Sequence, residues 1–375
     1  MPSQSSEIEG LVAGLRAEHP ELDAVAAATA DPLYVVGGAV RDQLLGRGRA
    51  DLDLVVVGDA AALGRSLGAD PVEHERFATA KVEIAGNEVD LATARTETYA
   101  EPGALPDVAP AASVEQDLGR RDFTVNAMAV PVGGEPALVD PHGGREDLDR
   151  GLLRVLHARS FEDDPTRAIR AARYAARLGF ELEEGTKRLL RETDLGTVSE
   201  DRRWAELRRL AAEGTAPKGF ELLAGWGLVE LRDGGTALAS EVGALLAREP
   251  WKGEVERADA VLAAVLKPEG GEAALAATNP ESPSEGVALA GRRNPVELVL
   301  ARALGAEWLD PYISEWRAVA LEIDGADLIA AGIPEGPAVG RGLAAALRAK
   351  LDGVVVDRDA ELATALAAAR DEQPS

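Results

Sequence analysis

The chain has 375 residues and no cysteine, which excludes disulfide frameworks, thiolate metal sites and cysteine nucleophiles. Its 65 acidic and 40 basic side chains give a net charge of −25, which taken alone argues against a polyanionic partner such as nucleic acid. No uncharged apolar stretch reaches the roughly 18 residues of a membrane span, so we expect no membrane partner and a cytoplasmic location.

The first 140 residues predict a mixed sheet behind an acidic, alanine-rich helical segment over residues 1–30. Residues 39–45 predict a short helix, and residues 101–112, with three prolines and no periodicity, predict a loop over the sheet. The apolar or alternating pattern of strands occurs at residues 33–36, 51–57, 80–85 and 88–93.

After residue 150 the pattern changes to that of amphipathic helices. Residues 267–286 are rich in glycine, proline and serine and predict an exposed linker or a long loop between helices. The first expected helices are residues 152–159, 165–178, 185–193 and 199–213.

Asp51 and Asp53 lie two residues apart in a predicted strand, so their carboxylates leave the same face. Two like charges on one face repel each other unless a cation neutralises them, which makes the pair a candidate for a divalent metal. An ordinary exposed strand edge would show the same pattern. Asp90, on the return strand of the predicted hairpin, adds a third carboxylate that can face the pair across the sheet.

Gly37 and Gly38 lie between the first predicted strand and the helix that carries Arg41. Backbone N–H groups of a glycine turn can approach a phosphate, and the helix N-terminus and Arg41 favour the same anion. A simple tight turn would also explain the two glycines. Three carboxylates beside a phosphate-binding turn suit two-metal nucleotidyl transfer, in which one ion activates a hydroxyl and the other holds the leaving pyrophosphate.

The chain resembles the class II tRNA nucleotidyltransferase and bacterial poly(A) polymerase family over about residues 30–215. The matching segments, in order, are LYVVGGAVRD, DLDLVVVG, VDLATARTE, DLGRRDFTVNAMA, LVDPHGGREDL and SFEDDPTRAIRAARYAARLGF. The resemblance implies an α+β fold with a polymerase-β-type nucleotidyltransferase head, built on a mixed sheet, and an all-helical neck, body and tail. The expected domains are a head (palm) at 1–150, a nucleotide-selecting neck at 151–215, a body at 216–310 and a tRNA-binding tail at 311–375.

The resemblance also implies roles for single residues in the head. Asp51 and Asp53 match the family's catalytic, metal-binding carboxylates, which implies a two-ion Mg²⁺ site, and Asp90 falls where the family has a third acidic residue. The Arg-Arg-Asp motif, which in the family helps to hold the ribose and phosphates of the nucleotide, consists here of Arg120, Arg121 and Asp122.

In the neck, Asp164 and Arg167 match a Glu-Asp-x-x-Arg motif that the family uses as an amino-acid template for the incoming base. Asp164 would also suit an ordinary helix N-cap. A guanidinium only donates and a carboxylate only accepts, so the pair can bond N3 and the amino group of cytosine, or N1 and the amino group of adenine. Guanine and uracil present these groups reversed.

Four arginines follow one another on one face of the predicted helix 165–178, and no acidic residue lies between them. This pattern predicts a cluster of unpaired positive charge, and the resemblance implies that Arg170 and Arg173 reach the nucleotide. Residues 151–213 hold 13 basic and 12 acidic side chains, a net charge of +1, so the other residues carry −26. The acidity is therefore compatible with a small electropositive cleft that handles one tRNA 3′ end.

The resemblance leaves several activities open. The first is addition of CCA to the tRNA 3′ end from CTP and ATP without a nucleic-acid template. The second is a partial enzyme that adds only the terminal A or only CC; the CC-only branch of the family has a shortened loop, whereas residues 95–120 are full length here. A poly(A) polymerase and a catalytically inactive RNA-binding paralogue are further alternatives, and no protein partner is implied.

Overall fold

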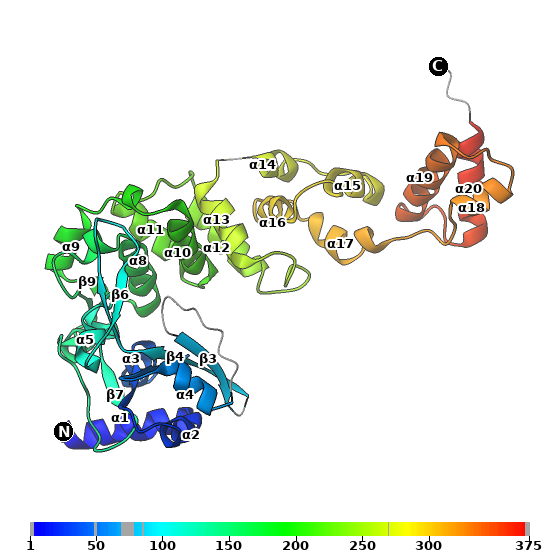
Figure 1. Ribbon diagram of the computed structural model, residues 1–375. Coiled ribbons are helices and arrows are strands. Elements are labelled where there is room, and N and C mark those ends of the chain that lie inside the picture. Colours follow the sequence, from blue (N-terminus) through cyan, green and yellow to red (C-terminus); the bar gives the residue numbers. More distant parts are fainter. Residues whose placement is uncertain (1–3, 49–50, 69–78, 85, 269, 372–375) are drawn as a thin grey trace. The chain divides into compact units, whose positions relative to one another are not determined.

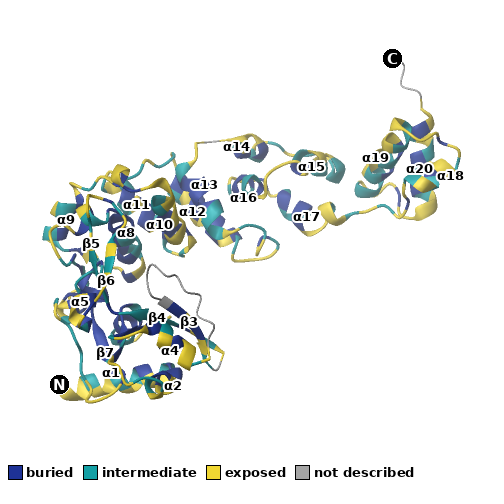
Figure 2. Ribbon diagram, viewed as in Figure 1, coloured by how far each residue is buried: buried dark blue, intermediate teal, exposed yellow. Residues whose placement is uncertain are grey.

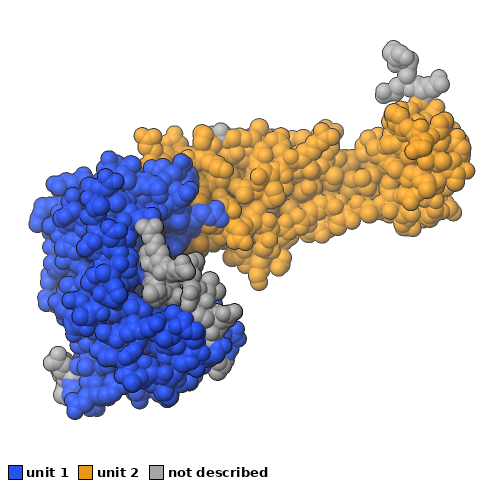
Figure 3. Space-filling model, viewed as in Figure 1, with its two compact units in different colours: residues 1–210, 225–228 blue, residues 211–224, 229–375 orange. Residues whose placement is uncertain are grey.

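The computed structural model describes residues 4–48, 51–68, 79–84, 86–268 and 270–371 (Figure 1). The chain divides into two compact units, one of residues 1–210 and 225–228 and the other of residues 211–224 and 229–375 (Figure 3). None of the helices in the described ranges combines the length and the apolar character that a bilayer crossing requires.

A five-stranded mixed sheet lies in the first unit (Figure 1). Its order is β3 (Thr79–Ile84), β4 (Asn87–Thr93), β2 (Leu52–Val56), β1 (Leu33–Val36) and β7 (Ala129–Pro131). β2 and β4 run parallel, and the other neighbours run antiparallel. The four strands predicted from the sequence are confirmed, with bounds that differ by at most one residue.

Short helices accompany the sheet, and the helical segments predicted before and after β1 are confirmed. The helices of this part are α1 (Gln4–Glu18), α2 (Glu21–Ala27), α3 (Gly38–Leu44), α4 (Ala60–Ser66), α5 (Val114–Leu118), the 3-10 helix η1 (Thr124–Asn126) and α6 (Gly144–Asp149). The prediction of a loop over residues 101–112 is wrong for residues 107–110. There β6 (Asp107–Pro110) pairs antiparallel with β5 (Arg95–Thr98), and this distant pairing supplies hydrogen bonds that local sequence does not reveal.

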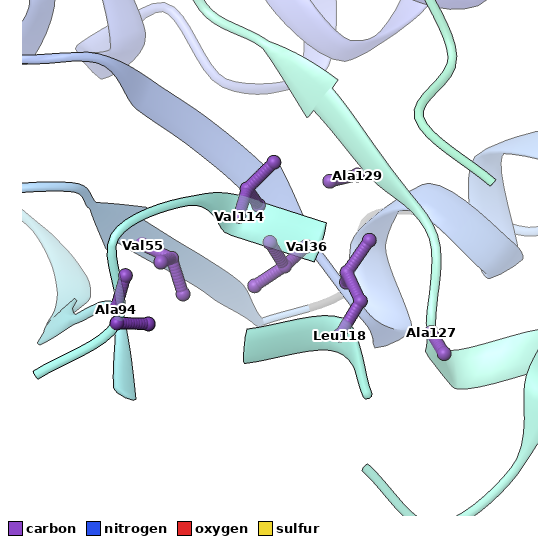
Figure 4. Packing of buried hydrophobic residues seen from close by; sticks show 8 residues of the cluster. Val36, Val55, Ala94, Val114, Leu118, Ala127 and Ala129 are labelled. Carbon is purple, nitrogen blue, oxygen red and sulfur yellow. The ribbon is translucent and has the colours of Figure 1, made fainter. Parts of the chain in front are cut away.

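Small apolar side chains join the sheet to α5. Figure 4 shows the cluster of Val36, Val55, Ala94, Ala111, Val114, Leu118, Ala127 and Ala129, all of them buried. Alanine and valine bring the backbones of β1, β2 and α5 close together, which leaves little freedom for α5 to move on the sheet. α5 is the helix that precedes the Arg-Arg-Asp motif, so this packing sets the position of that motif.

The rest of the first unit is mainly helical, but the helix predicted at residues 152–159 is wrong. β8 (Leu152–Leu153) pairs there in parallel with β9 (Glu181–Leu182). The other predicted helices are confirmed as α8 (Thr166–Leu178), α9 (Glu184–Leu190) and α10 (Glu200–Ala212), and α7 (Ser160–Asp163) precedes them. α8 ends at Gly179, whose φ of +75° is the left-handed conformation that favours glycine.

The second unit contains helices and no strand among its described residues. They are α11 (Ala216–Gly225), α12 (Gly235–Leu245), α13 (Arg257–Leu266), α14 (Gly271–Ala276), α15 (Pro283–Ala290), α16 (Pro295–Ala303), α17 (Leu309–Ser314), the 3-10 helix η3 (Trp316–Ala318), α18 (Gly325–Ala330), α19 (Pro337–Leu351) and α20 (Arg358–Arg370). The linker predicted at 267–286 is wrong, because α14 and part of α15 occupy it. Two residues of this segment begin a helix: Ser282 caps α15, and Pro283 is its first residue.

The last three helices pack through a small core of their own. Figure 2 colours the three helices by burial. The buried residues of this core include Leu328 on α18, Ala346 on α19 and Ala365 on α20. Gly342 lies in this contact: a Cβ added to it would come within 2.6 Å of the Ala365 carbonyl oxygen and 2.8 Å of a Leu328 methyl group. Only glycine allows α19 and α20 to approach so closely.

We predict that Gly342→Ala forces α19 away from α20 and lowers the stability of this helix group by about 1–3 kcal/mol. Gly340→Ala is the matched control, because it lies in the same helix with no atom within 4 Å of an added Cβ. Alanine is the better helix former, so this control should stabilise α19 by about 0.5–1 kcal/mol. Hydrogen exchange of the α19 and α20 amides measures both effects, and equal protection in the two variants would contradict the packing.

Candidate active site

A cleft of about 620 Å³ opens in the first unit, and its wall contains most of the site residues predicted from the sequence. The predicted residues in the wall are Gly37, Gly38, Asp53, Asp90, Arg120, Arg121, Asp122, Asp164, Arg167 and Arg170. Asp51, Arg41 and Arg173 are described residues that the wall does not include. The structure thus brings together residues that lie more than 130 positions apart in the sequence.

The acidic part of the cleft lies on β2 and β4. Asp53 and Asp90 are direct partners in the register of these parallel strands, so they occupy neighbouring positions on one face of the sheet, and Asp51 lies two residues before Asp53. The pKa of the Asp53 carboxyl is raised, mainly by desolvation, although water reaches the side chain. The charges of Asp90 and Asp51 raise the pKa further, and the charge of Arg121 opposes this increase.

These carboxylates fit a hard divalent cation. Oxygen ligands are those that Mg²⁺ prefers, and an ion would relieve the repulsion between Asp53 and Asp90. In the described part of the chain, no three acidic or histidine side chains are already close enough to form a complete metal site. The donor set is therefore the neighbouring pair, with Asp51 next along the strand.

The glycine turn lies beside one of the motif arginines. Gly37 has φ +68° and ψ −121°, a conformation that other residues rarely adopt. A Cβ at Gly37 would lie 2.9 Å from the Arg121 Nη1 atom. Glycine at this position therefore lets the Arg121 guanidinium lie against the turn, where it gives this part of the cleft wall a positive charge.

Asp117 in α5 holds both arginines of the motif. Its carboxylate is fully buried and accepts hydrogen bonds from Arg120 Nε at 2.9 Å, Arg121 Nη2 at 3.1 Å and the Arg95 backbone N–H at 3.2 Å. Burial by itself would raise the pKa of Asp117, but Arg121 and Arg120 outweigh it and lower the pKa. Glu97 accepts a further bond from Arg120 Nη1 at 3.0 Å. The sequence analysis missed Asp117, although its spacing of three and four residues to the arginines was a usable signal.

Asp122, the third residue of the motif, is a buried residue of the cleft wall and pairs with the helix α8. Arg170 donates from Nε at 2.8 Å and from Nη2 at 2.6 Å to Oδ2 of Asp122. Its Oδ1 accepts from the Phe123 N–H and from Asn126 Nδ2. Burial acts to raise the pKa of Asp122, but Arg170 and Asn126 outweigh it and lower the pKa to about 2. Asp122 thus links the segment after α5 to the helix α8 through an ion pair.

The four arginines of α8 are not a cluster of unpaired charge, so that prediction is wrong. Arg170 pairs with Asp122, and Arg177 donates to Asp42 at 3.2 Å. The acidic partners come from the preceding sheet domain and not from the helix itself, which is why the local sequence concealed them. Arg173 lies with its guanidinium 4.7 Å from the centre of the Tyr174 ring.

Arg41 also has a different setting from the one predicted. Its side chain is 1% exposed and donates to both Asp42 oxygens, at 2.8 and 2.9 Å, and to Asn126. Its guanidinium lies 5.3 Å from the centre of the Tyr174 ring. In the structure Arg41 therefore supports the cleft from outside its wall, and Tyr174, which the sequence analysis missed, lines the cleft between the arginines.

Asp164 and Arg167 face the cleft from the start of α8. Arg167 is 4% exposed, and its hydrogen bonds go to the carbonyl oxygens of Arg120 at 2.8 Å and Ser160 at 3.5 Å. Asp164 Oδ1 accepts from the Thr166 N–H at 3.1 Å, as an N-cap would, and from Arg202 Nη2 at 2.9 Å. These carbonyl oxygens carry no net charge, so they do not neutralise the Arg167 guanidinium. The guanidinium can therefore still bind a polar or negatively charged ligand.

We predict a pH-dependent contribution of the Asp122–Arg170 pair to stability. The pKa of Asp122 falls from 3.8 in the unfolded chain to about 2 in the folded protein, so the stabilisation is complete above about pH 5 and is lost as the pH falls towards 2. Asp122→Asn should therefore be less stable than the unchanged protein by about 2 kcal/mol at neutral pH, and the gap should close near pH 2. Thermal unfolding of both proteins between pH 2 and 7 measures this, and a gap independent of pH would contradict the assignment.

Comparisons with known proteins agree on one family. A family model described as the poly A polymerase head domain matches residues 33–154. The A-adding tRNA nucleotidyltransferase of Halalkalibacterium halodurans is 43% identical over 206 residues, which are 51% of this chain and 48% of that protein. The CC-adding tRNA nucleotidyltransferase of Deinococcus radiodurans is 37% identical over 345 residues, which are 88% of this chain and 87% of that protein. The chain thus spans about half the length of the first relative and most of the second.

Solved structures extend the match over both units. The Thermotoga maritima CCA-adding enzyme complexed with tRNA aligns with a TM-score of 0.67 and 28% identity, over 98% of this chain and 96% of that one. A complex of CCA-adding enzyme with CTP aligns with a TM-score of 0.73 and 27% identity, over 97% and 99% of the two chains. With the α+β nucleotidyltransferase fold and a relative matched over nearly its whole length, the chain belongs to the class II tRNA nucleotidyltransferase and bacterial poly(A) polymerase family.

Proposed function

We propose that this protein adds CCA to the 3′ end of tRNA from CTP and ATP without a nucleic-acid template. The observation that carries the proposal is the cleft itself: a pair of carboxylates suited to metal ions and a carboxylate with a guanidinium suited to a base edge line the same cleft. The relatives add nucleotides to tRNA, and matched structures hold tRNA or CTP, which supports the same substrates here.

In the reaction, the 3′ hydroxyl of the tRNA attacks the α-phosphorus of the nucleotide. A phosphorus–oxygen bond to the tRNA forms, the bond to the oxygen that bridges the α- and β-phosphates breaks, pyrophosphate leaves, and the hydroxyl proton passes to water. Enzymes of this family generally use divalent metal ions. We assign Mg²⁺ to Asp51, Asp53 and Asp90, where it would lower the pKa of the attacking hydroxyl and stabilise the charge on the pyrophosphate.

We place the phosphates next to the metal carboxylates, where the charge of Arg121 acts on Asp53. Gly37, Gly38 and Arg121 meet there, and Asp117 orients Arg121 and Arg120 before any nucleotide arrives. Because the arginines are already fixed, little side-chain entropy is lost when they bind phosphate. Asp122 acts through Arg170 and Asn126, so we assign it a positioning role in place of direct contact with the nucleotide.

The base is selected by Arg167 and Asp164. The Arg167 guanidinium is held by a hydrogen bond to the Arg120 carbonyl oxygen. The Asp164 carboxylate is held by hydrogen bonds from Arg202 and from the Thr166 N–H. A fixed donor and a fixed acceptor side by side favour cytosine and adenine, and they leave unpaired polar groups against uracil and guanine. One site can thus serve both CTP and ATP.

Addition of CC alone is the second candidate, because the Deinococcus radiodurans relative, matched over 88% of this chain, is a CC-adding enzyme. The segment after β4 favours the complete activity, because residues 95–120 form the β5–β6 pair and α5 and show no shortened loop. We also propose the head, neck, body and tail at 1–150, 151–215, 216–310 and 311–375, with tRNA bound by the tail. The cytoplasmic location stays a prediction.

We predict that the purified protein extends three tRNAs, ending before CCA, after C and after CC, to the complete CCA end when CTP and ATP are both present. Labelled products on sequencing gels measure each addition. Failure to extend the tRNA that ends in CC would establish the CC-only enzyme, and long A tails on any RNA would establish a polymerase. Asp53→Ala is the control and should lose at least a thousandfold in rate, because it removes a carboxylate of the metal site.

We predict that Arg167→Ala lowers the preference for CTP and ATP over UTP and GTP at least tenfold, because the only fixed donor of the proposed template is lost. Arg167→Lys keeps the charge but not the planar fork and should lose most of the preference as well. Competition assays with pairs of labelled nucleotides measure the ratio directly, and unfolding curves check that the variants fold. An unchanged ratio would remove Arg167 from nucleotide selection.

A further inference from the structure

A lysine lies in line with the carboxylates of the cleft. Lys81 in β3 is the register partner of Asp90 in β4, and Asp90 is the partner of Asp53 in β2. The three side chains therefore occupy one row across the sheet, on the face that lines the cleft. Lys81 Nζ lies 3.1 Å from Asp90 Oδ1.

The same ammonium group has a second acidic partner. Glu88 lies two residues before Asp90 on β4, so it faces the same side of the sheet, and Lys81 is also paired with it. The side chains of Lys81, Glu88 and Asp90 are 58%, 69% and 45% exposed, so both ion pairs are open to water and easily exchanged. Lys81 can therefore release Asp90 and keep a partner.

We propose that Lys81 is a resident counter-cation of the metal site, which holds Asp90 in the metal-free protein and keeps only Glu88 as its partner when a divalent ion binds. The inference rests on the proposed function, which assigns the metal to Asp53 and Asp90. A divalent ion at Asp90 repels the ammonium group and competes with it for the same oxygen. Lys81 is thus a positioning residue: it limits repulsion between the empty carboxylates and weakens metal binding.

Metal binding in the absence of substrate tests this role directly. A unit charge about 5 Å from a divalent ion in water changes the binding constant about tenfold, and salt reduces the effect. We therefore expect Lys81→Gln to bind Mn²⁺ about three to ten times more tightly than the unchanged full chain, as measured by electron paramagnetic resonance of free Mn²⁺. The gain should shrink as KCl is raised from 0.05 to 0.5 M.

Two controls separate position from net charge. Lys187→Gln removes the same charge from a surface pair with Glu184 and should change Mn²⁺ affinity less than twofold. Lys81→Arg keeps the charge beside Asp90 and should bind Mn²⁺ within twofold of the unchanged chain. Equal or weaker binding of Mn²⁺ by Lys81→Gln would overturn the role of Lys81.

Asp90→Asn distinguishes failure of this inference from failure of the proposed function. If Asp90→Asn weakens Mn²⁺ binding at least tenfold while Lys81→Gln leaves it unchanged, only the counter-cation is wrong. If Asp90→Asn binds Mn²⁺ as tightly as the unchanged chain, the metal does not use this carboxylate, and both the metal assignment and the role of Lys81 are overturned.

Discussion

The buried ion pair between Asp122 and Arg170 is the interaction on which the site depends. It joins the chain segment after α5, which carries the Arg-Arg-Asp motif, to the helix α8, whose start carries Asp164 and Arg167. The Asp122 side chain is 7% exposed and that of Arg170 27%, so loss of either partner leaves a poorly solvated charge at a cost of about 2 kcal/mol. The pair therefore fixes the distance between the carboxylates on the sheet and Asp164 and Arg167 at the start of α8, which we propose to read the base.

Arginines are arranged around this pair by buried acids. Asp117 orients the two arginines of the motif, and Asp42 accepts bonds from Arg41 and Arg177. The net charge of −25 thus says little about the cleft, because these acids serve to hold guanidinium groups in place. Arginines that are fixed before a ligand arrives bind it at a small entropic cost, so an acidic protein can present the site that we propose for a triphosphate and one RNA end.

The sequence predicted what depends on local periodicity. The period of two along a strand predicted that Asp51 and Asp53 share a face, and the hairpin predicted that Asp90 faces them across the sheet. The structure has Asp53 and Asp90 as register partners. The sequence did not predict contacts between distant segments. Examples are the packing of the Arg41 guanidinium against the Tyr174 ring and the pairing of residues 107–110 with β5. Such contacts depend on which segments the fold brings together, and neither propensity nor spacing contains that information.

The central claim is that Asp122 and Arg170 act as one unit that holds the Arg-Arg-Asp motif and the helix α8 together. A double-mutant cycle with Asp122→Asn, Arg170→Gln and the double variant tests it most directly, with both unfolding free energy and CTP affinity as readouts. The account predicts a coupling of about 2 kcal/mol in stability and the same loss of CTP affinity in all three variants. Additive effects in both readouts would contradict it.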